Sequence, residues 1–341
     1  MQRLFISILL LSVTYFGVAQ ERADLYLKTG LTNANNLLEA YLTPGLEGFG
    51  RTINTGWYNT ARTHKSMGFS ITLSAASTVL PSSELTFDPS SVQTNDIFFS
   101  ENAVPTVGSP DGGVNMIYSG SFVADDGNTY TANERFFSPP GADLELIPTP
   151  MVQVGIGLFK ATDIKIRYMF PFDYRDIEFD MLGVAVIHDL KQWFAPLRLS
   201  PFELSIMGGF TSMSASVGHT GIENSIGAKS EFSVSSIGGQ LLFSKKLGNI
   251  FTPYFGLGYE SFTTSYDLKG TYNVEVDVID ADETSKIVTY TNPFSMDVEG
   301  SGVKATVGFR FKLAFFTYHA DYTYMNGSTF STGIGVSFNE I

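Results

Sequence analysis

Apolar and polar residues alternate with a period of two over much of this chain, and this pattern constrains the fold more than any other feature. One run places Val303 and Val307 on one face and Lys304 and Arg310 on the other. Such a period is typical of β-strands with one apolar face, whereas an α-helix repeats about every 3.6 residues. The alternation predicts strands near residues 66–76, 149–159, 163–171, 176–188, 201–214, 230–245, 251–266, 297–313, 315–324 and 328–338.

The length of these runs and the position of their aromatic residues distinguish two kinds of β-protein. A soluble β-sandwich also alternates apolar and polar residues. Several runs here extend for about ten residues or more, the length that a tilted strand needs to cross a bilayer. Tyr and Phe also lie toward the strand ends, as in the aromatic girdles of membrane barrels. We therefore expect an all-β fold: an antiparallel transmembrane β-barrel with its apolar faces toward lipid and its polar faces toward the lumen.

Composition excludes several other classes. The 341-residue chain has no cysteine, which rules out disulfide scaffolds, thiol catalysis and cysteine-ligated metal sites. Its 21 Lys and Arg against 34 Asp and Glu give a formal net charge of −13 without a basic block. Phosphate backbones are bound by clustered cations, so nucleic acid is not expected as a partner.

Residues 1–19 have the features of a signal peptide. An early cation, Arg3, precedes an apolar run, and the small residues Gly17 and Ala19 precede a cut before Gln20. The apolar run is shorter than the ~20 residues that a membrane-spanning helix needs. We expect export through a cleaved signal peptide at residues 1–19, an N-terminal helical segment over residues 20–62, and a barrel over residues 63–341.

Connections between the expected strands alternate between short and long. Bacterial barrels have short periplasmic turns and longer outer loops, and ten strands keep this alternation throughout, with both barrel ends on the periplasmic side. The segment Leu80–Pro148 is too long for an ordinary loop. We expect this segment to add one strand pair, which gives about 12 strands in total, within a range of about 10 to 14.

The region before the first strand has helical spacing. Asn33–Leu42 places Leu38 and Tyr41 on one side of a helix, and Pro44 is the first residue of a second short helical turn that includes Leu46. Such a segment can plug the lumen or lie beneath it in the periplasm, and we favour the plug. The candidate plug residues are Leu38, Tyr41, Pro44 and Leu46.

The order of these segments resembles that of known membrane proteins. The helical stretch Tyr41–Leu46 and the glycine-rich last strand Gly333–Phe338 look like those of FadL-type transporters of hydrophobic compounds. The stretch Gly183–Trp193 resembles more closely an uncharacterised family of Gram-negative outer-membrane β-barrels. This resemblance implies a place in the outer membrane, and Phe338 resembles the C-terminal aromatic residue that the outer-membrane assembly machinery reads.

The residue pattern contains no constellation for catalysis or metal binding. The four histidines, His64, His188, His219 and His319, lie on different segments without a metal-ligand spacing. The sequence alone assembles no set of nucleophile, base and acid. We therefore expect no cofactor, no metal site and no enzymatic activity.

Hairpin closure predicts which charged residues meet in the lumen. A tight turn after residue 313 sets Arg310 opposite His319, and Asp321 then lies on the same lumenal face. The same reasoning sets Arg167 opposite Asp180. Alternatively, these charges only solvate the lumen or hold the plug. The candidate lumen-lining residues are Lys165, Arg167, Glu178, Asp180, Lys304, Arg310, Lys312, His319 and Asp321.

Two functions follow from this architecture. The first is a passive channel or transporter for small, hydrophobic molecules, in which the plug gates a path lined by the lumenal residues. The polarity of the lumenal candidates also keeps a narrow hydrophilic channel open. The alternative is a surface-exposed structural or ligand-binding barrel without transport activity. The expected partners are outer-membrane lipid, the assembly machinery and, for the first function, a small hydrophobic ligand.

Overall fold

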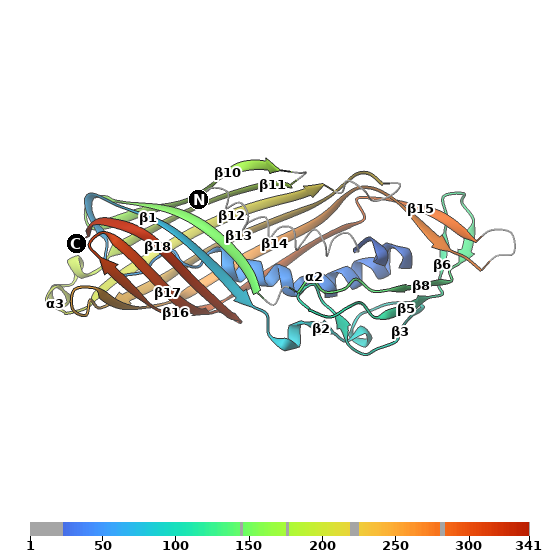
Figure 1. Ribbon diagram of the computed structural model, residues 1–341, viewed down its shortest axis with the longest axis horizontal. Helices are drawn as coiled ribbons and strands as arrows, with labels where there is room; N and C mark the ends of the chain where they lie inside the picture. The colour runs from blue at the N-terminus through green and yellow to red at the C-terminus, as the bar shows by residue number, and fades with distance from the viewer. Residues whose placement is uncertain (1–22, 144–145, 175–176, 219–224, 280–283, 341) are drawn as a thin grey trace.

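The computed structural model describes residues 23–143, 146–174, 177–218, 225–279 and 284–340, so the expected signal peptide lies outside the described residues. Within them, ten strands form a closed antiparallel ring, because β13 pairs with both β12 and β14, and β1 pairs with both β9 and β18 (Figure 1). The ring consists of β1 (His64–Val79), β9 (Leu146–Gly157), β10 (Thr162–Tyr174), β11 (Ile177–Asp189), β12 (Glu203–Gly218), β13 (Ser225–Ser244), β14 (Phe251–Asp277), β16 (Phe294–Leu313), β17 (Phe316–Tyr324) and β18 (Ser328–Glu340).

The strand pair expected from Leu80–Pro148 does not join this ring, which therefore lies at the lower end of the expected range. The insertion instead forms strands of two to four residues in three small sheets, too short to cross a bilayer. Its Pro, Gly and Asp clusters interrupt each run. The elements are η2 (Ser82–Glu84), β2 (Thr86–Phe87), η3 (Pro89–Ser91), β3 (Ile97–Phe99), β4 (Val104–Pro105), β5 (Asn115–Tyr118), β6 (Ser121–Val123), β7 (Thr129–Thr131) and β8 (Glu134–Phe137).

Apolar side chains cover the outside of the ring in a continuous band, which we call the apolar belt. Its members include Leu182, Ile237 and Val303, whose side chains are 50%, 62% and 64% exposed. Such a band needs lipid around it, because soluble proteins rarely expose a large contiguous apolar surface. On β11 and β13 the belt gives way to exposed polar residues, Asp180 beyond Leu182 and Ser233 beyond Ile237. The strands thus continue past the hydrocarbon layer.

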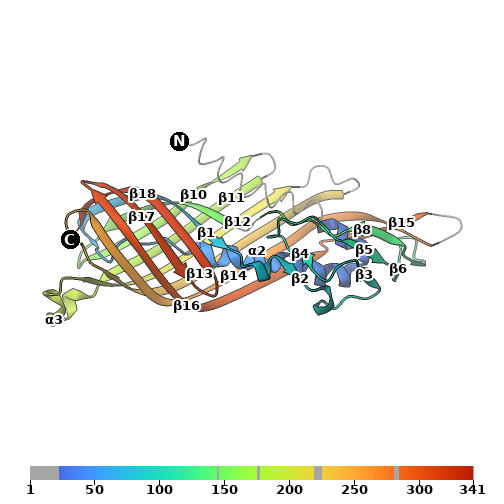
Figure 2. The same ribbon diagram turned by 60° about the horizontal axis from the view of Figure 1, so that its bottom comes forward.

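The barrel has two different ends. At one, which we call the turn end, β1 begins, β18 ends and short connections join the strands, apart from a loop with η4 (Lys191–Trp193) and α3 (Ala195–Arg198) (Figure 1). At the other, the cap end, lie the insertion over residues 80–143 and an extension of β14 that pairs with β15 (Ser285–Thr291) (Figure 2). This extension prolongs β14 beyond its pairing with β16.

The N-terminal segment runs lengthwise through the ring. It begins at the cap end with η1 (Ala23–Thr29), continues as α2 (Leu31–Ile53) and reaches the start of β1 at the turn end. The expected break at Pro44 is wrong: α2 is a single helix of 23 residues that contains this proline. The Thr43 hydroxyl donates to the Glu39 carbonyl at 2.7 Å within this turn. Neither α2 nor any other described helix combines the length and the apolarity required to span a membrane.

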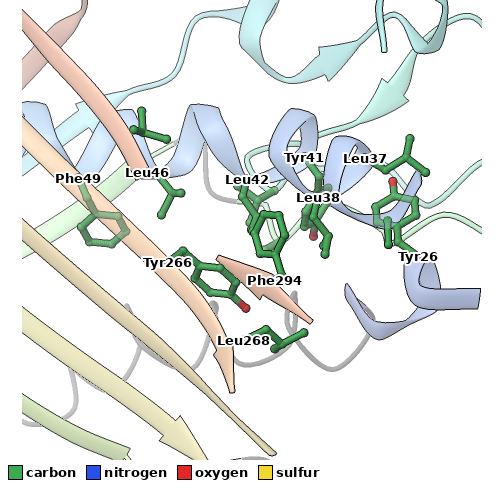
Figure 3. Close-up of a cluster of buried hydrophobic side chains, with 14 of the residues drawn as sticks. Tyr26, Leu37, Leu38, Tyr41, Leu42, Leu46, Phe49, Tyr266, Leu268 and Phe294 are labelled. Carbon is green, nitrogen blue, oxygen red and sulfur yellow. The ribbon is translucent and has the colours of Figure 1, made fainter. Parts of the chain in front are cut away.

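A hydrophobic core at the cap end holds the first half of α2. Leu38, Tyr41 and Leu46 are fully buried there, between the wall residues Tyr266 and Leu268 on one side and the insertion on the other (Figure 3). The insertion is tied to the helix by hydrogen bonds from the Tyr41 hydroxyl to the Pro140 carbonyl and from the Val107 amide to the Tyr41 carbonyl. Burial raises the pKa of Tyr41 far above its usual range, so this hydroxyl stays a neutral donor.

Polar contacts close the outer rim of this cap. Glu134 on β8 accepts from Lys28 of η1 at 3.1 Å and from the backbone N–H of Asp277 at 2.7 Å. Nearby, Lys286 of β15 pairs with Asp126 in the β6–β7 hairpin at 3.1 Å. The Asn128 backbone N–H, the Tyr130 hydroxyl and Lys286 together hold the pKa of Asp126 at about 2. The hairpin therefore stays docked against β15 at mildly acidic pH.

Glycine 50 allows the helix to approach the wall closely, and this contact gives a stability prediction. A Cβ at Gly50 would lie 2.0 Å from Cδ2 of the buried Phe262 ring. Gly50→Ala should gain up to about 1 kcal/mol of helix propensity but lose about 1–3 kcal/mol through overlap, so we expect a net decrease in stability. The midpoint of urea unfolding in lipid vesicles measures it. Gly112→Ala, where nothing lies within 4 Å, is the control, and a rise in the Gly50→Ala midpoint would contradict the packing.

Candidate functional site

The lumen is filled by the end of α2 and by the extended segment 54–63 that follows it. α2 contacts five of the ten strands of the wall: β1, β9, β13, β14 and β16. The segment after the helix continues this pattern, since Tyr58 donates to Gln240 at 2.6 Å and the Ala61 backbone N–H donates to Ser244 at 3.0 Å. The preference for a plug over a segment beneath the barrel therefore agrees with this structure.

Arg167 binds the open C-terminal end of α2. The last carbonyls of a helix have no partner within the helix and carry the negative end of its dipole. Arg167, fully buried on β10, donates from Nη1 to the Ile53 carbonyl at 3.1 Å and from Nη2 to the Thr55 carbonyl. Its guanidinium carbon also lies 3.8 Å from the centre of the Trp57 ring, which adds a cation–π contact.

Lys165 and Lys304 complete a set of three wall cations that we call the cationic clamp. Lys165 donates to the Trp57 carbonyl at 2.8 Å, and Lys304 donates to the Asn54 carbonyl at 3.2 Å. Lys304 also pairs with the buried carboxylate of Glu260 at 2.7 Å. All three cations thus meet main-chain carbonyls of the segment that follows α2.

The clamp makes an otherwise costly burial of charge favourable. A buried cation destabilises a fold unless charges or hydrogen-bond acceptors compensate its lost hydration. Here the helix dipole, the unpaired carbonyls and Glu260 supply that compensation to Lys165, Arg167 and Lys304. Conversely, the plug carbonyls would be buried without donors if these cations were absent. Plug and wall therefore stabilise each other.

Glycines on the inner face of the wall leave room for the aromatic residues of the plug. A Cβ at Gly183 would lie 3.0 Å from the Trp57 ring, and one at Gly256 would lie 1.9 Å from the Tyr58 hydroxyl. In β-strands glycine often marks such a close approach of another chain segment. The wall is thus shaped for this particular segment.

A second polar group lies closer to the turn end. The cross-strand positions predicted for Arg310 opposite His319 and for Asp321 opposite Gly308 are confirmed by the register of β16 and β17. His319 lies 3.5 Å from the Asn59 amide of the plug, and Asp321 accepts from the Tyr254 hydroxyl at 2.8 Å. Arg310 does not pair with either residue, because its guanidinium reaches Glu340 instead.

A chain of hydrogen bonds joins the first and last strands at this end. His64 at the start of β1 is linked through Nδ1 to Asp163 at 2.7 Å and through Nε2 to Ser337 at 3.0 Å. Ser337 in turn bonds to Glu340, which also pairs with Lys312 at 3.0 Å. We call these five residues the terminal latch, because they hold the start of β1, the start of β10 and the end of β18 together.

Asp163, His64 and Ser337 are linked in the order in which an acid, a base and a nucleophile are linked in a catalytic triad. The sequence pattern did not reveal this arrangement. Its environment differs from that of a catalytic set, since the Ser337 side chain is only 4% exposed and its hydroxyl already bonds to Glu340. A reacting carbon must come within about 3 Å of the nucleophile, and the 390 Å³ cavity at this end is lined by other residues, among them Arg62 and Lys191. The three side chains join the start of β1 to β10 and β18.

Most of the predicted lumenal residues lie inside the wall, but two do not. Glu178 and Asp180 are exposed on the outer face of β11, around a cavity of about 300 Å³ beyond the apolar belt. The predicted pairing of Arg167 with Asp180 is wrong as well, because Arg167 lies opposite Gly183. The main cause is that β10 stays paired with β11 as far as Tyr174 and Ile177, so the hairpin turn lies later in the chain than the expected pairing requires, and a bulge between Met169 and Phe172 also changes the register by one residue. Lys165, Arg167, Lys304, Arg310, His319 and Asp321 are buried inside, and Lys312 is partly exposed at the lumen edge.

Several residues of the site escaped the sequence analysis. Glu260 gave no signal because its strand neighbours are polar as well, and Trp57 lies in an irregular segment without periodicity. Glu340 follows Phe338, the last apolar position of its strand, and nothing in the pattern marked it as a site residue. The pairing of β1 with β18 brings His64 and Glu340 together. The terminal latch can therefore be predicted only when the closure of the ring is known.

The clamp yields a prediction for Arg167. Arg167→Met keeps the length of the side chain but leaves the Ile53 and Thr55 carbonyls buried without donors, at about 1–3 kcal/mol for each lost partner. We expect a lower thermal midpoint and faster protease cleavage within residues 51–63. Lys246→Met, at an exposed cation of a turn, is the matched control. Unchanged cleavage in Arg167→Met would show that the clamp does not hold the plug.

The chain is similar to several solved structures. Similar solved structures include Ail, the attachment invasion locus protein of Yersinia pestis, at 7% identity over 81% of this chain and 100% of that one, with a TM-score of 0.27. The translocator domain of the autotransporter NalP from Neisseria meningitidis is 8% identical over 81% of this chain and 89% of that one, with a TM-score of 0.29. The outer membrane protease OmpT from Escherichia coli is 8% identical over 81% and 98%, with a TM-score of 0.34.

Identities and scores this low say nothing about ligand or activity. A search of the curated proteins finds no match. The resemblance to FadL-type transporters stays a prediction, whereas the expectation of an uncharacterised family is confirmed by a family model that matches residues 1–338. The chain belongs to the family described as a family of unknown function, DUF6588.

Proposed function

We propose that this protein is an outer-membrane barrel with a permanently closed lumen, and that it acts at its cap end as a surface-exposed structural or ligand-binding protein. The observation that carries this proposal is the double attachment of α2. Its first half is buried in the apolar core of the cap, and its C-terminal end is held by the cationic clamp.

The energy of the cap core supports a fixed plug. Full burial of one large apolar side chain contributes about 1.5–3 kcal/mol, and the fully buried or nearly fully buried residues of α2 include Leu37, Leu38, Tyr41, Leu42, Leu46 and Ile53. Withdrawal of the helix would therefore cost on the order of 10 kcal/mol, comparable with the whole stability of a typical domain. A gate that opens in normal use would need a far smaller difference between its two states.

The orientation in the membrane follows from the two ends. Bacterial barrels keep short turns in the periplasm and long connections outside. By this rule the turn end faces the periplasm, and the cap, with α2, the insertion and β15, stands outside the cell. The polar residues beyond the apolar belt, such as Ser233 and Asp180, then lie in water above the lipid.

Passive transport is the second candidate. The observation in its favour is the polar inner face of the wall, where Lys165, Lys304 and Asp321 would suit a hydrated path if the plug moved. The same polarity disfavours hydrophobic solutes as cargo. Transport thus requires a displacement of α2, whereas the proposal of a closed barrel does not.

Conductance distinguishes the two candidates. We expect no ion current and no uptake of sugars or hydrophobic probes by the full-length protein in planar bilayers and liposomes, because the plug fills the lumen. Deletion of residues 23–62, which removes both α2 and the segment after it, should produce stable current steps. Altered mobility on unheated gels confirms that each variant is folded. Steady current or solute flux through the wild-type protein would overturn the closed barrel in favour of transport.

The position of η1 gives a topological prediction. Ala23 lies at the cap end, on the far side of the lumen from the start of β1. An epitope placed directly before Ala23 should therefore bind antibody on intact cells. The same epitope inserted at Gly248, in an exposed turn-end connection, should bind only after the outer membrane is permeabilised. The reverse labelling pattern would invert the orientation.

A further inference from the structure

The turn-end connections carry apolar side chains that no part of the described protein covers. Leu199, Phe159 and Trp193 are 94%, 75% and 58% exposed, respectively. Other exposed apolar side chains lie in further connections and strand ends round the rim, so the exposed apolar residues form a ring rather than an isolated patch. The further members are Met67, Phe194, Leu247, Ile250 and Phe316.

Trp193 shows how this ring is placed relative to the wall. Its indole N–H, which can only donate, bonds to Nε2 of His188 at 2.8 Å, and Nδ1 of His188 is bonded to Thr162 at 2.8 Å. His188 alternates along β11 with the inward-facing Ile187 and continues the outward row of Val184 and Val186. The Trp193 ring is therefore held against the outside of the barrel, at the lower edge of the apolar belt.

Exposed cations accompany these apolar side chains. Lys160 follows Phe159, Arg198 precedes Leu199, and Lys246 precedes Leu247, each exposed. Lys65 and Lys245 add to the set. In contrast, the carboxylates near this rim are turned inward and hydrogen-bonded: Asp163, Asp189, Glu203 and Glu340. A chain with a net charge of −13 thus presents exposed cations among the described residues of its turn-end rim.

We propose that this rim binds phospholipids with an anionic headgroup in the periplasmic leaflet of the outer membrane. This inference rests on the orientation proposed above. Trp193 is held beside the outward row of β11 at the turn-end edge of the apolar belt, so the same bilayer that covers the belt also reaches Trp193 and Leu199. Aromatic rings favour the boundary between lipid tails and headgroups, and Lys and Arg next to them meet the phosphates.

The cations decide which lipid is preferred. Each Lys or Arg close to an anionic surface contributes about 1 kcal/mol, roughly a fivefold preference. A zwitterionic headgroup offers the apolar contacts but much less of this attraction. The loop at residues 190–202 is fixed to the wall by Trp193 and by the bond from Gln192 to the Lys160 carbonyl at 2.8 Å. The rim is therefore preformed for a lipid.

Tryptophan fluorescence tests this inference, because the chain has only two tryptophans. Trp57 is buried in the lumen, out of reach of lipid, and Trp193 reports on the rim. The protein is reconstituted in vesicles of zwitterionic phosphatidylcholine that contain a small fraction of acyl-brominated lipid. That lipid is either phosphatidylglycerol, which is anionic, or phosphatidylcholine, with bromine at the same depth.

We expect brominated phosphatidylglycerol to quench Trp193 several-fold more strongly than brominated phosphatidylcholine at equal fraction, with the difference lost at high salt. The variant Lys160→Gln/Lys245→Gln/Lys246→Gln should lose the headgroup preference but keep basal quenching. It leaves Arg198 in place, because that side chain donates to the Gln192 carbonyl within the loop. Equal quenching by both lipids would remove the anionic preference, and no quenching by either would place the loop in water.

A third variant separates failure of the rim from failure of the barrel. In Leu182→Trp/Trp193→Phe the reporter lies in the apolar belt, away from the turn-end rim, where any brominated lipid should quench it. Quenching there, without quenching of Trp193 in the wild-type protein, would overturn the rim proposal alone. No quenching at position 182 would overturn the membrane placement itself, which the conductance result does not address.

Discussion

The structure depends on the helix carbonyls that end inside the barrel. A helix that stops in the middle of a lumen leaves its last carbonyls without water and without partners. Arg167 of the wall donates to the Ile53 carbonyl, and Lys304 and Lys165 donate to the Asn54 and Trp57 carbonyls that follow the helix. Each of these cations would destabilise the fold if it were buried without a partner. Neither the plug nor the inner wall is therefore a stable surface by itself. This mutual dependence explains why so many charges lie inside the barrel.

Two different forces act on one helix. At the cap end, apolar burial fixes α2 without strict geometry, whereas in the lumen directional hydrogen bonds fix its end to specific wall positions. The first supplies most of the stabilisation and the second sets the register of the plug along the barrel axis. A helix held in both ways cannot slide, because any axial shift would break the clamp before it relieved the core.

The sequence was sufficient for features that depend on local periodicity. Alternation located the strands, and the tight turn after Leu313 correctly placed Arg310 opposite His319. The same reasoning failed for Arg167, because β10 and β11 stay paired as far as Tyr174 and Ile177, and a bulge near Phe172 also changes the register by one residue. It also failed at Pro44, where tertiary packing of α2 outweighs the cost of a proline. The clamp itself was beyond prediction, since its acceptors are backbone carbonyls, which every residue carries.

The path of the N-terminal segment has a consequence for biogenesis. The end of α2 and residues 54–63 are encircled by a ring in which each of the ten strands pairs with both of its neighbours, although β9 and β10 pair over only five positions. The chain cannot enter such a ring sideways. Either α2 is already in place when β1 and β18 pair, or η1 is drawn lengthwise through the finished barrel. In the first case, the pairing of β1 with β18, which the terminal latch reinforces at His64 and Glu340, encloses the plug as the ring closes.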